Sequence, residues 1–248
     1  MASKIVLITG ANSGVGFATS KFFSSQPGYH VIMACRDAQK GKKALSEIQS
    51  AGEVKGSLSL LELDVDSDES IRTAFEAVKK EFGKVDVLLS NAGVIALGSE
   101  GREKLTRIFQ TNVAGAFLFA EAFTPLLLKS SKPYLIQVSS SLGSLAWSSD
   151  PNNPYYHSAW DEYRMSKAAL NLGTIQQHKR LHSQNVKVFA FCPGLVRSNL
   201  RGEAEEAVSA GGNAGDPLDS AKALFDIAEG KRDADAGKFV NGAGVIPW

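Results

Sequence analysis

The chain has 248 residues, of which 44% are hydrophobic and 21% are charged, and its formal net charge is +1. This is an ordinary globular composition, with enough apolar residues to fill a sizeable core. The small net charge gives no electrostatic reason to expect a nucleic-acid or membrane partner. The length suits one domain and no shift in composition divides the chain, so we predict a single domain over residues 1–248.

Two cysteines, Cys35 and Cys192, lie in separate apolar runs. Their spacing predicts neither a disulfide framework nor a zinc site, and we expect no bound metal. The first strand is expected to begin near Lys4, which leaves no room for a leader peptide, and no run approaches the roughly 18 apolar residues of a membrane span. These features lead us to expect a cytoplasmic protein.

Apolar runs rich in β-branched residues alternate with segments of helical pattern along the whole chain. The expected strands are Ile5–Thr9, His30–Cys35, Ser57–Leu63, Val85–Ser90, Tyr134–Ser139, Lys187–Cys192 and Lys238–Asn241. The expected helices are Val15–Ser24, Asp37–Ser50, Ser67–Phe82, Arg102–Lys129, Tyr163–Ser183 and Pro217–Glu229. The alternation predicts an α/β Rossmann fold, a doubly wound parallel sheet of about seven strands flanked by helices.

The first expected strand leads into Thr9–Gly16, which contains Gly10, Gly14 and Gly16. A tight turn from a strand into a helix needs backbone angles that glycine adopts at little cost. The absence of a side chain also lets a diphosphate approach the N–H groups at the start of the helix. The pattern predicts a dinucleotide site, and an ordinary glycine-rich loop is the alternative.

The second expected strand ends at Cys35 and is followed by Arg36 and Asp37. An acidic residue at this strand end binds the ribose of NAD, whereas a guanidinium accommodates the 2′-phosphate of NADP. Arg36, with Lys40 close in sequence, therefore favours NADP(H) as the cofactor; a surface cation is the alternative. We expect Asp37 to cap the following helix.

Two further positions bear on the helices themselves. Asp66 and Glu69 have the spacing of a capping box, which predicts Asp66 as the N-cap of the third helix. Pro125 is expected to kink or break the long helix Arg102–Lys129, because proline lacks the N–H group that continues a helix.

Tyr163 is followed four positions later by Lys167, and none of the other tyrosines among the five has a lysine at this spacing. Residues at this spacing share one face of a helix. An ammonium beside a phenol lowers the pKa of the phenol, which is normally about 10, and such a tyrosine can give a proton to a carbonyl oxygen. A chance pair on a surface helix is the alternative.

Small and polar residues follow three other expected strands. A hydroxyl of Ser139–Ser141, after the fifth strand, can hold a substrate oxygen against Tyr163. Small residues after the fourth and sixth strands permit a cofactor to approach the backbone closely. Each group alone is also compatible with an ordinary loop. The cofactor-binding candidates here are Asn91, Ala92, Gly93, Pro193, Gly194, Val196 and Ser198.

In their order along the chain, these motifs resemble those of the classical short-chain dehydrogenase/reductase family over nearly the whole length. Each motif is common, whereas the ordered combination is highly specific. The resemblance also assigns Asn12, Ser13 and Val15 to the cofactor turn. The matching positions are Thr9-Gly10-x-x-x-Gly14-x-Gly16, Asp64-Val65, Asn91-Ala92-Gly93, Asn112, Ser140, Tyr163-x-x-x-Lys167 and Pro193-Gly194.

The resemblance implies a catalytic set of Asn112, Ser140, Tyr163 and Lys167. Tyr163 would be the acid and base, and Lys167 would lower its pKa and hold the nicotinamide ribose. Ser140 would orient the substrate carbonyl, a role favoured over its neighbours by Gly143 three residues later. Asn112 would support Lys167 through a bound water.

The remaining implied contacts are to the cofactor. Asp64 would contact the adenine amino group, with the Val65 backbone nearby. Ser198 stands where the family usually has a threonine that binds the nicotinamide carboxamide, and it keeps the hydroxyl. Ser90 replaces the asparagine that commonly precedes Asn91, a change expected to matter little.

Tyr163 follows Ser140 at a wider spacing than in compact family members. The added residues form Trp147–Trp160, within an expected substrate loop at 143–162. Their aromatic side chains predict a wall for a bulky or polycyclic ketone; a surface loop pinned by aromatic side chains is the alternative. The glycine-rich segment 197–216 is expected to be a mobile lid.

We therefore expect an NADP(H)-dependent enzyme that interconverts a ketone or aldehyde and an alcohol, similar to the small fungal ketone reductases of specialised metabolism. Its partner would be a small carbonyl compound, and the family implies a homodimer or homotetramer. A nonenzymatic dinucleotide-binding sensor or scaffold remains an alternative, because fold does not fix function. A dehydratase or epimerase on the same fold is a further alternative.

Overall fold

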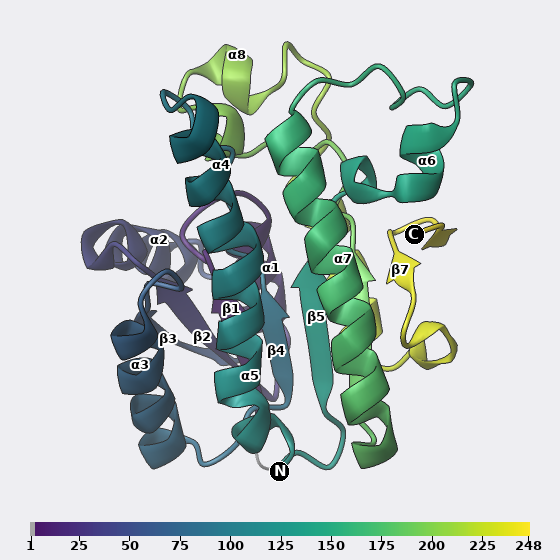
Figure 1. Cartoon of the computed structure of the whole chain (residues 1–248). Coiled ribbons are helices and arrows are strands. Elements are labelled where there is room, and N and C mark those ends of the chain that lie inside the picture. Colours follow the sequence, from purple (N-terminus) through teal and green to yellow (C-terminus); the bar gives the residue numbers. More distant parts are fainter. Residues whose placement is uncertain (1–2) are drawn as a thin grey trace.

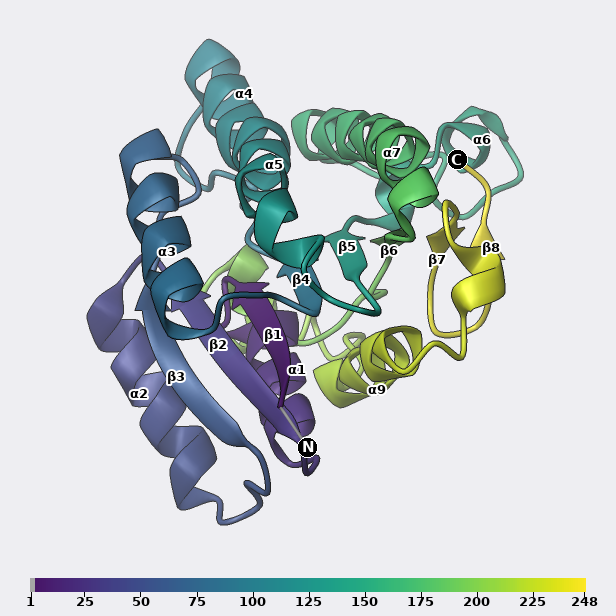
Figure 2. The same cartoon turned by 90° about the horizontal axis from the view of Figure 1, so that it is seen from below.

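The computed structural model describes residues 3–248 and contains a central eight-stranded sheet in the order β3-β2-β1-β4-β5-β6-β7-β8 (Figures 1 and 2). All neighbouring strands are parallel except β7 and β8. The strands are β1 Lys4–Thr9, β2 Tyr29–Cys35, β3 Ser57–Glu62, β4 Val87–Ser90, β5 Tyr134–Val138, β6 Lys187–Phe191, β7 Phe239–Val240 and β8 Val245–Ile246.

Helices cover both faces of this sheet, as Figure 2 shows. One face packs against α1, α2 and α9, and the other against α3, α5 and α7. The helices are α1 Gly14–Ser24, α2 Ala38–Ser50, α3 Asp68–Glu81, α4 Gly101–Phe109, α5 Ala116–Leu127, α6 Leu145–Ser149, α7 Asp161–Leu181, α8 Glu205–Val208 and α9 Pro217–Ala228. The arrangement is the expected Rossmann-like α/β domain.

The near-continuous apolar runs form strands because both faces of the sheet are buried. Every residue of β4 and β5 is buried, and β1 is buried from its second residue onward. Such strands hold their carboxyl ends in fixed positions, so the loops that follow them are presented together at one edge.

The sheet has one strand more than the expected seven. The extra strand, β8, pairs with β7 in the antiparallel sense through Phe239 with Ile246 and Val240 with Val245. Both strands have only two residues. An element this short leaves no periodicity in the sequence, which is why β8 was not predicted.

The capping box predicted at Asp66 is wrong. The N-cap of α3 is Ser67, whose side chain accepts a hydrogen bond from the Ser70 N–H at 3.2 Å. Asp66 instead accepts a hydrogen bond from the Thr111 hydroxyl at 2.8 Å. The prediction for α2 is confirmed, since the Asp37 carboxylate accepts from the Gln39 and Lys40 N–H groups at 2.9 and 3.0 Å.

The helix does not break at Pro125. Pro125 lies inside α5, which ends at Leu127, so the missing N–H falls in the last turn and little helix remains to be displaced. The irregularity in this long helical segment lies earlier, in a π-helical stretch at Gln110–Gly115 between α4 and α5. Such wide turns occur frequently at functional sites.

Candidate active site

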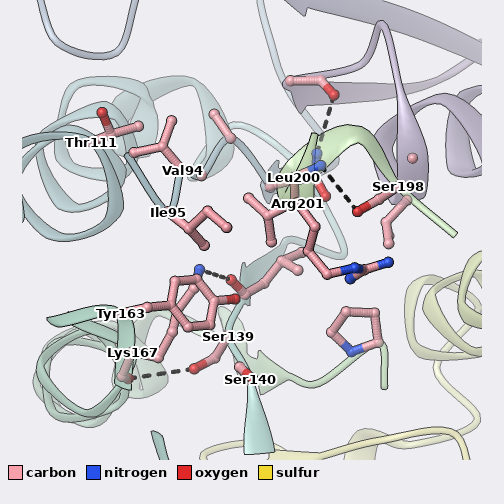
Figure 3. A pocket seen from close by; sticks show the side chains of 18 of the residues that line it. Val94, Ile95, Thr111, Ser139, Ser140, Tyr163, Lys167, Ser198, Leu200 and Arg201 are labelled. Carbon is pink, nitrogen blue, oxygen red and sulfur yellow. Dashed lines mark hydrogen bonds between the residues drawn. The ribbon is translucent and has the colours of Figure 1, made fainter. Parts of the chain in front are cut away.

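A cavity of about 630 Å³ opens beyond the carboxyl ends of the parallel strands (Figure 3). It brings together all but two of the predicted site residues; Gly16 and Asn112 lie outside its lining. The predicted residues that line it are Gly10, Asn12, Ser13, Gly14, Val15, Arg36, Asp64, Val65, Asn91, Ala92, Gly93, Ser140, Tyr163, Lys167, Pro193, Gly194, Val196 and Ser198.

The glycine turn has the geometry that a diphosphate needs. Gly10 and Gly14 have positive φ angles of 64° and 53°, which other residues adopt only with strain. Ser13, the N-cap of α1, makes no side-chain capping bond, and the first turn contains no acidic residue. The N–H groups at this helix end are therefore available to an anion, and the turn fits a dinucleotide.

The loop after β4 locks this turn in place. The Asn91 side-chain amide donates to the Thr9 carbonyl at 2.8 Å, and the Asn91 backbone N–H donates to the Thr9 hydroxyl at 2.9 Å. A Cβ added to Gly16 would lie 2.4 Å from the Gly10 carbonyl oxygen. Gly16 thus acts from outside the cavity, by allowing α1 to pack against the turn.

At the other end of the cavity, Arg36 is exposed directly after β2, and Asp64 and Val65 follow β3. Lys40 does not line the cavity; its ammonium pairs with Glu203 at 3.4 Å. Asp66 also lines this end, and its Oδ1 is buried without a hydrogen-bond partner among residues 3–248. An unused acceptor beside Asp64 suits a ligand that donates hydrogen bonds, as an adenine amino group does.

Tyr163, Ser140 and Lys167 meet at the centre of the cavity (Figure 3). The Lys167 ammonium donates to the Val138 carbonyl at 2.9 Å and lies 5.6 Å from the centre of the Tyr163 ring. A Cβ on Gly143 would lie 2.6 Å from the Lys167 carbonyl carbon. The glycine therefore lets the Ser140 turn approach α7, which carries both other groups.

Burial sets the protonation of both side chains. Desolvation raises the pKa of the Tyr163 phenol above its usual value, although the nearby Ser140 hydroxyl and the charge of Arg201 act in the opposite direction. Desolvation also lowers the pKa of the Lys167 ammonium to about 8. The pKa of the Tyr163 phenol is therefore raised and not lowered as the Tyr163–Lys167 spacing predicts, because desolvation is the largest influence on it.

Asn112 lies fully buried in the π-helical stretch, not in a regular helix as expected. Its side chain accepts from the Val94 N–H at 2.8 Å and donates to the Val94 carbonyl at 2.9 Å and the Ser166 hydroxyl at 3.1 Å. Among residues 3–248 it makes no direct hydrogen bond to Lys167. It ties the loop after β4 to α7, the helix that carries Tyr163.

The three serines after β5 have different surroundings. The Ser139 hydroxyl is buried and donates to Asn171 Oδ1 at 2.6 Å, and the backbone N–H of Ser141 donates to Cys192 Sγ at 3.1 Å. Ser140 is less buried than either and interacts with the Tyr163 hydroxyl. All three serines line the cavity, and Ser140 is the most exposed of them.

Only part of segment 143–162 reaches the cavity. Tyr155, Ser158, Ala159 and Trp160 line it. Trp147 does not line it but stacks on Tyr155, with 5.7 Å between ring centres. Trp160 has a φ of 77°, a strained backbone of the kind found at binding sites, and is 42% exposed at the N-cap of α7.

Segment 197–216 contributes Ser198, Asn199, Leu200 and Arg201 to the lining of the cavity. Ser198 lies against the glycine turn, 2.8 Å from a Cβ placed on Gly14. Sequence reasoning missed Arg201, because it belongs to no motif. The one sequence feature that could have identified Arg201 is its position three residues after Ser198, in a loop already assigned to the site.

Two absences are relevant to other kinds of function. Within residues 3–248, no group of three or more His, Cys, Asp or Glu side chains is arranged to hold a metal ion. In the same residues, no helix combines the length and apolar character needed to cross a membrane.

The family model for short chain dehydrogenases matches residues 4–209. The short-chain dehydrogenase/reductase tropE of Talaromyces stipitatus is 35% identical, with 96% of this chain and 94% of that protein covered. The short-chain dehydrogenase/reductase eupG of a Phoma species is 33% identical, with 98% and 97% covered. The NADPH-bound carbonyl reductase from chicken fatty liver has a TM-score of 0.83 at 25% identity, with 100% of both chains covered. The chain belongs to the short-chain dehydrogenase/reductase family.

Proposed function

We propose that this protein is an NADP(H)-dependent carbonyl reductase that interconverts a ketone or aldehyde and an alcohol. The observation that carries this proposal is the meeting of Tyr163, Ser140 and Lys167 in the cavity that also contains the glycine turn. A sensor or scaffold would need the turn but not a phenol, a hydroxyl and an ammonium grouped beside it.

A nicotinamide cofactor held by the glycine turn would supply a hydride for the carbonyl carbon of the substrate. Ser140 donates a hydrogen bond to the carbonyl oxygen and holds it beside Tyr163. The phenolic proton then passes from Tyr163 Oη to that oxygen, so that the carbonyl becomes an alcohol. Burial keeps the phenol protonated, which suits the acid needed for reduction.

Lys167 and Asn112 support this proton transfer. The Lys167 ammonium, already held by the Val138 carbonyl, stabilises the phenolate that Tyr163 becomes and binds the nicotinamide ribose. Asn112 holds the backbone of Val94 by two hydrogen bonds. The neighbouring Gly93 lies close to both side chains, because a Cβ added to it would lie 3.3 Å from Asn112 Oδ1 and 3.6 Å from Lys167 Nζ. A bound water between the two side chains would complete the relay.

The substrate is proposed to be bulky, with a large apolar part. Tyr155 and Trp160 line one side of the cavity, and Leu142, Leu195 and Leu200 line further parts of it. Flat rings and branched aliphatic side chains favour an aromatic or polycyclic ketone over a small polar one.

An NADPH-oxidation screen across aliphatic, aromatic and polycyclic ketones tests the proposed function. We expect turnover with at least one aromatic or polycyclic member. Product formation without loss of NADPH would instead indicate a dehydratase or epimerase. Tight NADPH binding without turnover across the panel would indicate a sensor or scaffold.

We predict that the protein binds NADPH more tightly than NADH, because Arg36 can pair with the 2′-phosphate that NADH lacks. Removing such a charged hydrogen bond in Arg36→Ala should weaken NADPH binding about 10- to 100-fold and leave NADH binding unchanged. Fluorescence titration with each cofactor measures both constants. Lys42→Ala, an exposed cation on α2 outside the cavity, is the control. Equal affinities for the two cofactors in the unaltered protein would exclude this role.

Assembly and location complete the proposal. We expect a cytoplasmic homodimer or homotetramer, as the family resemblance implies. Analytical ultracentrifugation measures the state of assembly, and a monomer across the accessible concentration range would contradict it.

A further inference from the structure

Two arginines on segment 197–216 have opposite surroundings. Arg197 is exposed and forms a salt bridge with Glu205, with Nη2 2.8 and 2.9 Å from its two carboxylate oxygens. Arg201 is half-buried and lines the cavity. Among residues 3–248 no carboxylate lies within 4.0 Å of the Arg201 guanidinium. The two cations therefore differ in what balances their charge.

Backbone carbonyls hold the Arg201 guanidinium at a fixed place in the cavity. Nε donates to the Ala207 carbonyl at 3.0 Å, and Nη2 donates to the Val196 and Val208 carbonyls at 2.8 and 2.9 Å. The N–H groups of Nη1 have no acceptor among the described residues 3–248. A long side chain held this rigidly, with donors unused, is prepared for a ligand rather than free in solvent.

Neutral carbonyls satisfy hydrogen bonds but leave the positive charge unpaired. A half-buried cation without a counter-ion is unfavourable, and burial lowers the pKa of the Arg201 guanidinium accordingly. Tyr163 acts on the guanidinium electrostatically, and Figure 3 shows Arg201 and Tyr163 on different sides of the same cavity. An anion bound between them would complete the charge balance.

We propose that Arg201 is an anion-binding residue of this cavity and that its Nη1 group pairs with an anionic oxygen of the bound ligand. The chemistry fits two sources. Ser198, three residues earlier, lies against Gly14 at the N-terminus of α1, which places the segment over the position expected for the cofactor diphosphate. Arg201 also faces the reacting phenol, where a substrate carboxylate or similar acidic group would lie.

The substrate source rests on the proposed carbonyl reductase function, whereas anion binding itself does not. The first experiment therefore uses inorganic pyrophosphate, titrated calorimetrically into the unaltered protein, Arg201→Gln, Arg201→Lys and Arg197→Gln. Arg197→Gln is the matched control, because it removes the same charge from the same segment outside the cavity. Circular dichroism checks the fold of each variant.

We expect Arg201→Gln to weaken pyrophosphate binding about 10- to 100-fold, Arg201→Lys to weaken it about three- to tenfold because it keeps the charge but not the paired N–H donors, and Arg197→Gln to change binding less than about threefold. If Arg201→Gln fails to fold, the pyrophosphate affinities of Arg201→Lys and Arg197→Gln are compared. A larger loss of affinity in Arg201→Lys supports pairing of the Arg201 guanidinium with the anion, and an equal loss contradicts it. Equal binding in all proteins, or none in the unaltered protein, excludes an anion at this position in the free enzyme and overturns the diphosphate source.

The second experiment separates the sources. If Arg201 meets the diphosphate, Arg201→Gln weakens NADPH binding but not binding of adenosine 2′-monophosphate, which lacks the diphosphate. If it meets the substrate, Arg201→Gln raises the KM for a ketone bearing a carboxylate and not for its methyl ester, with NADPH binding unchanged.

Absence of both effects together with unaltered pyrophosphate binding overturns the proposal. An unaltered protein that binds pyrophosphate but neither binds NADPH nor reduces a ketone would overturn the proposed function and leave the assignment of Arg201 standing.

Discussion

Replacing Tyr163 by Phe is expected to reduce kcat about 10²- to 10⁴-fold, the usual contribution of a positioned proton donor. The change removes one hydroxyl and keeps the ring against which the Lys167 ammonium lies, 5.6 Å from its centre. Because the change leaves the glycine turn and Arg36 intact, NADPH binding should change by less than about threefold. Steady-state kinetics and a fluorescence titration with NADPH measure the two quantities.

A second tyrosine provides the control for this experiment. Tyr156 is 39% exposed, packs on His157 and does not line the cavity, so Tyr156→Phe removes the same hydroxyl without touching the proposed chemistry. Its kcat should equal that of the unaltered protein. Full activity in Tyr163→Phe would show that Tyr163 is not the proton donor. The Tyr163–Lys167 spacing would then not mark a catalytic pair.

The sequence was informative wherever a residue type is dictated by backbone geometry. The glycines of Thr9–Gly16 could be read as a phosphate turn because few other residues fit those backbone angles, and the structure has Gly10 and Gly14 at positive φ. The strands that are buried on both faces could also be predicted from their apolar runs. Since these strands are parallel, the motifs at their carboxyl ends were expected to meet, and they line one cavity.

Prediction failed where tertiary contacts decide a local choice. Asp66 and Glu69 have the spacing of a cap, but the Asp66 carboxylate accepts a hydrogen bond from Thr111 in the π-helical stretch, and Ser67 caps α3 instead. The π-helical stretch around Asn112 leaves no mark in the sequence, because its geometry depends on the buried contacts of Asn112 with Val94 and Ser166.

Electrostatics was the least predictable part of the site. The spacing of Tyr163 and Lys167 correctly placed both side chains in the cavity, but it contained no information about how deeply they are buried. Burial reverses the expected direction of the Tyr163 pKa shift. The place of Arg201 in the site could not be predicted for a related reason. Only the folded structure shows that its charge lies in the cavity, whereas the charge of Arg197 is paired with Glu205 outside the cavity.

Replacing Gly16 by Ala is expected to damage cofactor binding and stability together. A Cβ at Gly16 would lie 2.4 Å from the Gly10 carbonyl oxygen and 2.6 Å from Asn91 Nδ2, so the strain falls on backbone that cannot rotate away. Overpacking of this kind costs about 1–3 kcal/mol, and in a domain of this size each kcal/mol lowers Tm by roughly 2–4 °C. Because the turn itself must shift, NADPH binding should weaken at least about tenfold.

A second helical glycine separates this effect from a general response to alanine. Gly173 lies in α7, where an added Cβ would contact the Phe117 ring at an ordinary 3.4 Å. Gly173→Ala should gain helix propensity, worth about 1 kcal/mol, and should leave NADPH binding unchanged. Thermal unfolding and NADPH titration of both variants measure the contrast. If Gly16→Ala kept the Tm and NADPH affinity of the unaltered protein, the close packing of α1 on the turn would not be what forms the dinucleotide site.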